Sequence, residues 1–193
     1  MDSKQHILEA IKKNKPAETL LPDLLSFPAT DNLTEKYTQS LSLNGGSAIG
    51  INTLEDIHTY LKENFPEDLL VASLVEGIEG NMDAQDISDP HDLETVEVVL
   101  VSGEVGVAEN AAIWISEKSL PHRVLPFIAQ HLIIVLEEDQ LVTNMHEAYQ
   151  KINVAEGGYG VFIAGPSKTA DIEQSLVIGA HGARSLTVFL VKN

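Results

Sequence analysis

The residues best suited to chemistry lie between positions 159 and 184, where polar and charged side chains separate two apolar runs. The first run, residues 161–164, stops at a Gly-Pro pair, and hydroxyl, amine and carboxylate groups follow. Backbone N–H groups at a strand-to-helix turn, helped by nearby cations, bind carboxylates and phosphates. The stretch therefore predicts a small-anion pocket. Its candidate ligand-binding residues are Gly165, Ser167, Lys168, Thr169, Asp171 and Arg184, and its candidate catalytic residue is His181.

A second polar pair, Glu109 and Asn110, follows the apolar run 95–101 and a glycine-containing segment. In α/β sheets, ligands bind beyond the carboxyl ends of the strands. Glu109 is thus a second catalytic candidate and Asn110 a further ligand-binding one. We expect Glu109 to lie near the turn 165–171, because both segments follow strand ends.

Each of these residues also has a purely structural explanation. Ser167 or Thr169 can cap a helix, Asp171 suits the positive end of that helix, and Glu109 can occupy a solvated turn. The sequence leaves both interpretations open.

Five short apolar runs separated by turn residues predict the elements that position these groups. They are expected to form one sheet, with strands at 69–75, 95–101, 132–136, 160–164 and 186–191. A further short strand is expected at 45–51, and helices after Thr53, over 140–152 and from Ile172 to Ala180. The alternation predicts an α/β fold with a largely parallel sheet flanked by helices.

The N-terminal part differs from the rest of the chain. Ile7, Leu8 and Ile11 form an apolar stripe on a short predicted helix, and lysines follow near its end. Three prolines between residues 16 and 28 exclude a single regular element, so an extended arm that packs on the body or on a partner is expected. We therefore divide the chain into an arm, residues 1–40, and an α/β domain, residues 41–193.

Composition excludes several functions. The 193 residues carry 29 acidic against 12 basic side chains, a net charge of −17, which disfavours nucleic acids and anionic membranes as partners. No cysteine is present, so the chain lacks thiolate ligands for an iron–sulfur cluster. No metal-ligand spacing, dinucleotide fingerprint or P-loop is found. Without an apolar leader or a run of membrane-spanning length, a cytoplasmic protein is expected.

The motif Gly165-Pro166-Ser167-Lys168-Thr169-Ala170-Asp171-Ile172-Glu173, followed by Gly179-Ala180-His181-Gly182-Ala183-Arg184, resembles the signature of the LUD-domain family. Ala108-Glu109-Asn110-Ala111 supports the resemblance. It implies a fold like that of the sugar-phosphate isomerase and CoA-transferase superfamily, and a role in oxidising L-lactate to pyruvate with iron–sulfur partner proteins. The family commonly has Thr-Gly at 110–111 and Pro at 183.

Two functions follow from this resemblance. One is an accessory subunit of a lactate-oxidising system, which binds a small carboxylate or organises its partners, holds no cofactor itself, and would be catalytic only as part of that complex. The other is a stand-alone CoA-transferase-like or small-anion-binding enzyme, in which Glu109 would attack an acyl-CoA. Ala111 and Ala112, in place of glycines, count against the second. The sequence leaves oligomeric state open.

Overall fold

The computed structural model describes residues 3–20, 32–153, 158–168, 178–179 and 181–192. A five-stranded parallel sheet forms its centre, in the order β1-β9-β6-β3-β2. Its strands are β1 (Ser47–Ile51), β2 (Val71–Ser73), β3 (Val98–Ser102), β6 (His131–Glu137) and β9 (Ser185–Val191). The fold is therefore α/β with a parallel sheet, as the sequence predicts.

A second, four-stranded sheet has the order β7-β4-β5-β8. Its strands are β4 (Val105–Val107), β5 (Ile113–Ser116), β7 (Leu141–Val142) and β8 (Gly160–Ile163). β5 is antiparallel to both β4 and β8, whereas β4 and β7 are parallel.

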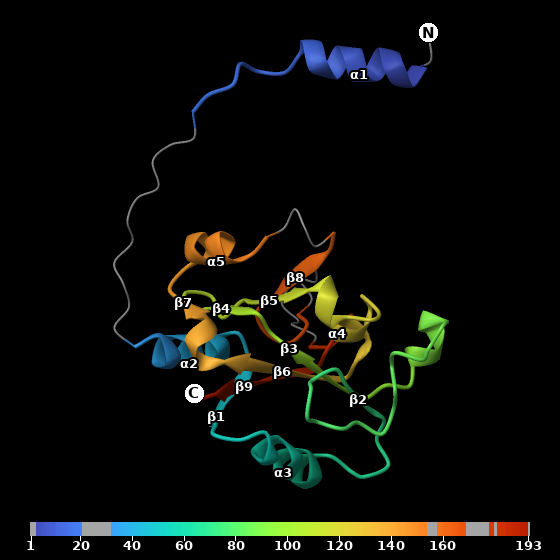
Figure 1. Ribbon diagram of the computed structural model, residues 1–193, viewed down its shortest axis with the longest axis vertical. Helices are drawn as coiled ribbons and strands as arrows, with labels where there is room; N and C mark the ends of the chain where they lie inside the picture. Colours follow the sequence, from blue (N-terminus) through green and yellow to red (C-terminus); the bar gives the residue numbers. More distant parts are fainter. Residues whose placement is uncertain (1–2, 21–31, 154–157, 169–177, 180, 193) are drawn as a thin grey trace.

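Helices complete the layers (Figure 1). They are α1 (Ser3–Lys13), α2 (Leu33–Leu43), α3 (Glu55–Asn64), α4 (Leu125–Ile128) and α5 (Met145–Lys151), with 3₁₀ turns at Pro90–Leu93, Glu117–Ser119 and Glu138–Gln140. Figure 1 shows α3 on one side of the parallel sheet and α5 on the far side of the second sheet.

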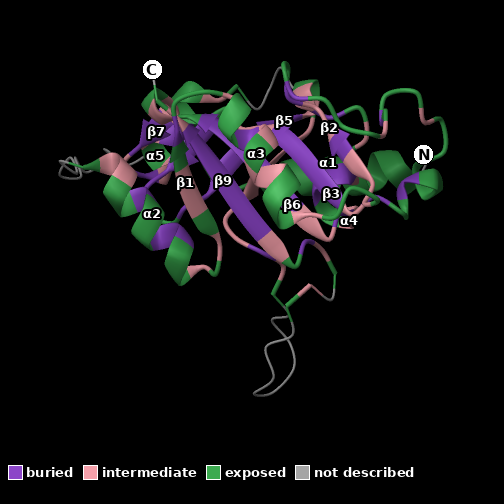
Figure 2. Ribbon diagram, turned by 90° about the horizontal axis from the view of Figure 1, so that it is seen from below, coloured by how far each residue is buried: buried purple, intermediate pink, exposed green. Residues whose placement is uncertain are grey.

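Successive side chains of the parallel strands point to opposite faces of the sheet, so they form two cores, one on each face. Val98 and Leu100 pack with Ile57 of α3, whereas Val99 and Val101 pack with residues of α2, α4 and the second sheet. Because both faces are covered, β3 and β6 are almost wholly buried, and they read in the sequence as continuous apolar runs. Figure 2 shows this buried centre within an exposed shell of helices.

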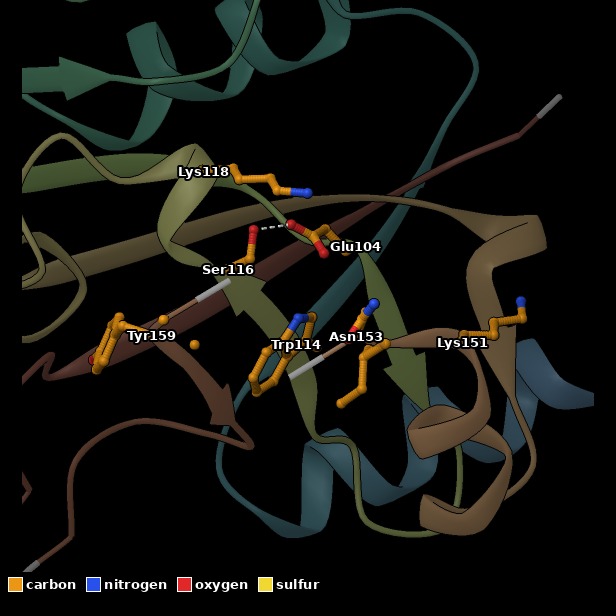
Figure 3. A pocket seen from close by; sticks show the side chains of 10 residues that line it. Glu104, Trp114, Ser116, Lys118, Lys151, Asn153 and Tyr159 are labelled. Carbon is orange, nitrogen blue, oxygen red and sulfur yellow. Dashed lines mark hydrogen bonds between the residues drawn. The ribbon is translucent and has the colours of Figure 1, made fainter. Parts of the chain in front are cut away.

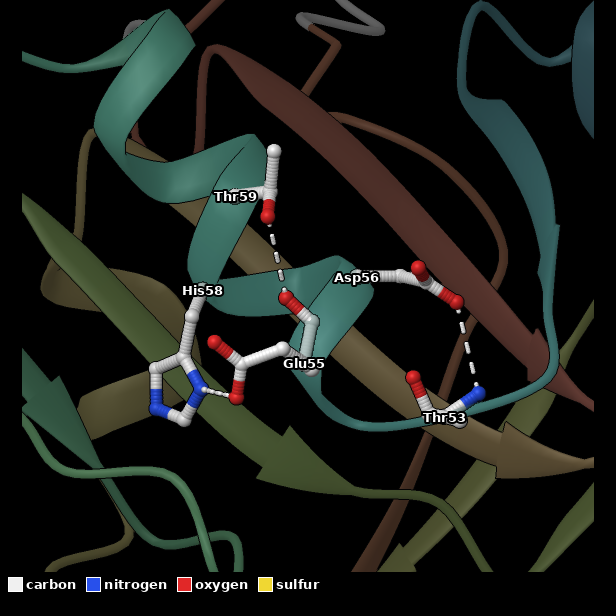
Figure 4. Close-up of polar contacts among 5 residues, drawn as sticks. All are labelled: Thr53, Glu55, Asp56, His58 and Thr59. Atoms are coloured by element: carbon white, nitrogen blue, oxygen red, sulfur yellow. Dashed lines mark hydrogen bonds and ion pairs between the residues drawn. The ribbon is translucent and has the colours of Figure 1, made fainter.

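The segment at α3 begins with a side-chain contact that the sequence pattern did not predict (Figure 4). Leu54 occupies the cap position of α3 without a side-chain bond, although Asn52 and Thr53 just before it are of the types that commonly cap helices. Instead, the Asp56 carboxylate accepts the N–H groups of Asn52 and Thr53, each at 3.3 Å. The carboxylate thus holds the preceding turn onto the first turn of the helix.

Two expectations about elements were wrong. The run 160–164 does form a strand, but β8 belongs to the second sheet, because its partner is β5 and not a parallel strand. The helix expected over 140–152 is shorter: Leu141 and Val142 form β7, and α5 begins only at Met145, after Asn144 accepts the N–H of Glu147 at 3.1 Å. The helix expected from Ile172 to Ala180 lies outside the described residues, apart from Ile178 and Gly179.

The boundary proposed between residues 40 and 41 falls inside α2. This helix buries Tyr37, Ser40 and Leu41, on both sides of that boundary. We therefore propose that the body begins near Asn32, whose side chain accepts the Glu35 N–H at 3.0 Å at the start of α2. Before it, α1 has no buried residue.

Candidate functional site

The predicted turn after β8 is built around a glycine. Gly165 has φ +147°, and a Cβ added there would lie 2.9 Å from the backbone carbonyl oxygen of Asn44, the residue that ends α2. A side chain at this position would displace backbone, so the close approach requires glycine. The turn is therefore fixed against α2, which comes from a distant part of the chain.

Residues that precede β9, among them Gly179, Gly182 and Ala183, lie against this turn. The Ser167 N–H donates to the Ala183 carbonyl oxygen at 2.8 Å, and the Gly179 N–H donates to the Ser167 carbonyl oxygen at 3.1 Å. A Cβ on Gly182 would lie 3.0 Å from the Ser167 Cβ. The structure thus brings Ser167, in the turn after β8, into contact with the residues that precede β9.

A cavity of about 310 Å³ lies between these loops and α4. Ser167, Lys168 and His181 supply a hydroxyl, an amine and an imidazole, and Phe127 and Phe162 supply apolar surface. The described lining consists of Pro126, Phe127, Leu132, Phe162, Ile163, Ala164, Gly165, Ser167, Lys168, His181, Gly182 and Ala183. The groups of this described lining suit a small anionic ligand with an apolar portion.

The turn after β8 offers fewer backbone donors than the sequence predicts. Backbone N–H groups at residues 166–169 were expected to bind the anion. Pro166 has no N–H, and that of Ser167 is already donated to Ala183. Two of the four expected backbone donors are thus excluded, and Lys168 brings a cationic side chain to the described lining.

Arg184 is not part of the cavity lining. Its stem packs on Gly179, where an added Cβ would come within 2.3 Å of the Arg184 Cγ. Its backbone N–H donates to the Gln130 carbonyl oxygen at 2.7 Å. This places Arg184 at the amino-terminal ends of β6 and β9.

His131 begins β6 beside Arg184. Its Nδ1 lies 2.7 Å from the Ser185 Oγ. Partial burial lowers the pKa of His131, the charge of Arg184 lowers it further, and Glu97 acts in the opposite direction. His131 therefore favours the neutral imidazole.

Glu109 and Asn110 are placed in different surroundings. The Glu109 carboxylate accepts the Met145 N–H at 2.8 Å, at the start of α5. The Asn110 carbonyl oxygen accepts a hydrogen bond from the Asn44 side chain at 2.8 Å. Asn44 therefore contacts both this turn and Gly165. The Glu109 carboxylate is bonded at the start of α5, and its proximity to the turn 165–171 stays a prediction.

Ala111 occupies an unusual conformation in that turn. Its φ is +60°, a left-handed value that favours glycine, and its methyl group is buried. The backbone thus keeps a geometry suited to glycine although the residue is alanine.

Thr169 and Asp171, the remaining predicted ligand-binding residues, lie outside the described part of the chain. Sequence reasoning missed Asn44 and Phe127. The Asn-Gly-Gly sequence at 44–46 signals a turn, but nothing in it indicates contact with residues 110 and 165.

A second cavity, of about 340 Å³, opens on the outer side of the second sheet (Figure 3). Ser116 Oγ donates to the Glu104 carboxylate there, with Lys118, Lys151 and Trp114 around them. Trp114 lies so close to Gly160 that a Cβ on Gly160 would come within 2.1 Å of its ring. The described lining of this cavity includes none of the residues predicted from the sequence.

Comparison with a solved structure supports the class of fold. The crystal structure of a DUF162 family protein from Deinococcus radiodurans superposes with a TM-score of 0.63 at 19% identity, covering 82% of this chain and 96% of that one. The LUD domain family model matches residues 83–191, which include every predicted site residue. This chain therefore belongs to the LUD-domain family.

Curated relatives agree with this assignment. A lactate utilization protein C from Bacillus pumilus is 36% identical over 89 residues, 43% of this chain and 37% of that protein. Another, from Deinococcus radiodurans, is 32% identical over 103 residues, 52% of this chain and 49% of that protein. The matched region thus spans less than half the length of either relative. Among the described helices, none has the length and apolar character needed to cross a bilayer.

Proposed function

We propose that this chain is an accessory subunit of a cytoplasmic system that oxidises L-lactate to pyruvate, and that it binds a small carboxylate in the cavity beside Ser167. The names of its relatives support the lactate-utilization role. The observation that carries the binding role is the cavity itself, which Lys168, Ser167 and His181 line together with apolar residues.

The electrons of lactate oxidation would pass to partner proteins. The chain has no cysteine to hold an iron–sulfur cluster. We therefore propose that partners carry the clusters, and that this chain contributes ligand binding or assembly. The CoA-transferase alternative gains no support from the described geometry, because the Glu109 carboxylate accepts the Met145 N–H.

Charge decides whether an anion can bind to a protein with a net charge of −17. At physiological salt, the field of distant charges is screened over about 8 Å. A charge-assisted hydrogen bond at contact contributes about 1.5–3 kcal/mol. The Lys168 amine therefore outweighs the distant carboxylates for a ligand in direct contact.

Calorimetric titration with L-lactate, pyruvate and inorganic phosphate tests the binding role. We expect millimolar or tighter binding of at least one of them. Lys168→Met keeps most of the stem but removes the charge, and should weaken that binding about tenfold, the equivalent of about 1.4 kcal/mol. Arg184→Ala should weaken it less, because Arg184 lies outside the lining.

Lys118→Met is the matched control, since Lys118 lines the other cavity. Equal effects of Lys118→Met and Lys168→Met, or no binding of any of the three anions, would contradict the site assignment. The subunit role has a separate test: co-purification of the chain with iron–sulfur proteins, and lactate-dependent dye reduction by that assembly. Undiminished dye reduction by the partners without this chain would refute it.

A further inference from the structure

Figure 1 shows α1 apart from the body of the molecule, and the helix carries an exposed apolar stripe. Ile7, Leu8 and Ile11 are 58%, 47% and 54% exposed, and they share one face of the helix. Three lysines follow at the end of the helix and just beyond it, Lys12, Lys13 and Lys15. A basic, amphipathic helix of this kind fits an apolar groove with an acidic rim.

The body of the same chain offers such a groove, with a volume of about 440 Å³. It lies between the C-terminal half of α3 and the edge strand β2. Leu61, Phe65, Leu69 and Val71 line it and are half-buried, whereas Glu67 and Glu79 are exposed on it.

Charge strengthens the match. Residues 51–100, which contain the whole groove, carry thirteen acidic side chains and only one basic side chain, Lys62. The segment 3–15 has the opposite balance, four lysines against the single acid Glu9. The two surfaces are therefore complementary in both polarity and charge.

We propose that α1 folds back onto its own chain and inserts Ile7, Leu8 and Ile11 into the groove between α3 and β2. The nineteen residues 14–32 connect α1 to the body and can span about 60 Å when extended. A domain of this size has a radius of gyration of about 15 Å, so the linker reaches the groove from any side.

The groove of the same chain is a better site than that of a second copy. A tether of this length gives an effective concentration near the millimolar range. At micromolar protein, the intramolecular contact is therefore favoured about a thousandfold over the same contact between two copies.

The absence of cysteine from the sequence allows a direct test by disulfide trapping. A disulfide requires Cα atoms about 4–7 Å apart, so it reports close contact. Leu8→Cys combined with Lys62→Cys places one thiol on the stripe and one at the groove. The control pair, Leu8→Cys with Lys151→Cys, puts the second thiol on α5, on the opposite side of the molecule (Figure 1).

We expect the groove pair to form an intramolecular disulfide at least tenfold faster than the control pair, at a rate independent of protein concentration. Ile11→Asp added to the groove pair should reduce this rate to that of the control pair, whereas Glu9→Asp, on the other face of α1, should leave it unchanged. Equal rates for the two pairs, insensitivity to Ile11→Asp, or disulfide-linked dimers that disappear on dilution would each overturn the proposal.

Discussion

The Tyr37 hydroxyl provides a test of how α2 is built into the core. Tyr37 is fully buried, and its hydroxyl has no hydrogen-bond partner among the residues that the structure describes. Its ring lies near Gly106, whose other close neighbours are the side chains of Leu136 and Leu141. A buried hydroxyl without a partner costs about 1–3 kcal/mol of folding free energy.

Tyr37→Phe removes this hydroxyl and keeps the ring. We expect the free energy of unfolding to rise by about 1 kcal/mol, the lower end of that cost, and the melting temperature by roughly 2–4 °C for a chain of this length. The matched control is Tyr60→Phe, because the Tyr60 hydroxyl lies 3.3 Å from the Thr187 hydroxyl. Losing that bond should lower stability by about 0.5–1.5 kcal/mol.

The pH dependence gives an independent check. Burial raises the pKa of Tyr37 above its value of about 10 in the unfolded chain. The stability that depends on protonated Tyr37 is therefore complete below pH 10 and declines above it, by up to about 1.4 kcal/mol per pH unit. Tyr37→Phe should lack this decline, so its advantage should widen between pH 10 and 11. Urea unfolding at both pH values measures it. A loss of stability in Tyr37→Phe as large as that in Tyr60→Phe would show that the hydroxyl has a partner and refute the reasoning.

Three further predictions concern Gly160, Ala111 and His131. Gly160→Ala should lower the free energy of unfolding by about 1–3 kcal/mol and shift the fluorescence of the single tryptophan, Trp114, because the new Cβ would lie 2.1 Å from its ring. The control is Gly50→Ala, where only the flexible end of a lysine is nearby, and its free energy of unfolding should stay within about 0.5 kcal/mol of wild type. Ala111→Gly should leave the free energy of unfolding within about 1 kcal/mol of wild type, because relief of the left-handed backbone strain offsets the loss of the buried methyl group and the added freedom of the unfolded chain. Ala111→Val should lower the free energy of unfolding by at least about 2 kcal/mol, as measured by denaturant unfolding. Since burial, and then Arg184, lowers the pKa of His131 in the folded state, stability should decline as pH falls below about 6.5, and His131→Gln should flatten that decline in urea midpoints compared at pH 7 and pH 5.

The sequence predicted most of the strands, but not in every case the strand with which each one pairs. The runs at β2, β3, β6 and β9 join the parallel sheet as expected. β8 was assigned to the same sheet because an apolar run indicates a strand without specifying which strand it pairs with. The error over β7 is similar, because Leu141 with Met145 fits helical spacing although Leu141 pairs in a strand.

The candidate site stays a prediction, but the packing around its residues can be compared with the sequence pattern. The glycines of the two loops have a structural reason, since Gly165 and Gly182 make approaches that a side chain would obstruct. The contribution of Asn44 could not be predicted, because it comes from the end of a helix about 120 residues earlier in the chain. The direction of Glu109 was equally hidden, since its partner Met145 belongs to a helix whose start was misplaced.

The boundaries of the family match have a practical consequence for β9. The match covers residues 83–191 and leaves out β1, which pairs with β9 from Ser47 opposite Thr187 to Ile51 opposite Val191. Without β1, the seven residues of β9 would become the edge of the sheet, with a row of unpaired backbone groups on an apolar strand. Such edges recruit strands from other copies. Residues 83–191 expressed alone should therefore aggregate, whereas the chain from residue 32 onwards should remain dispersed.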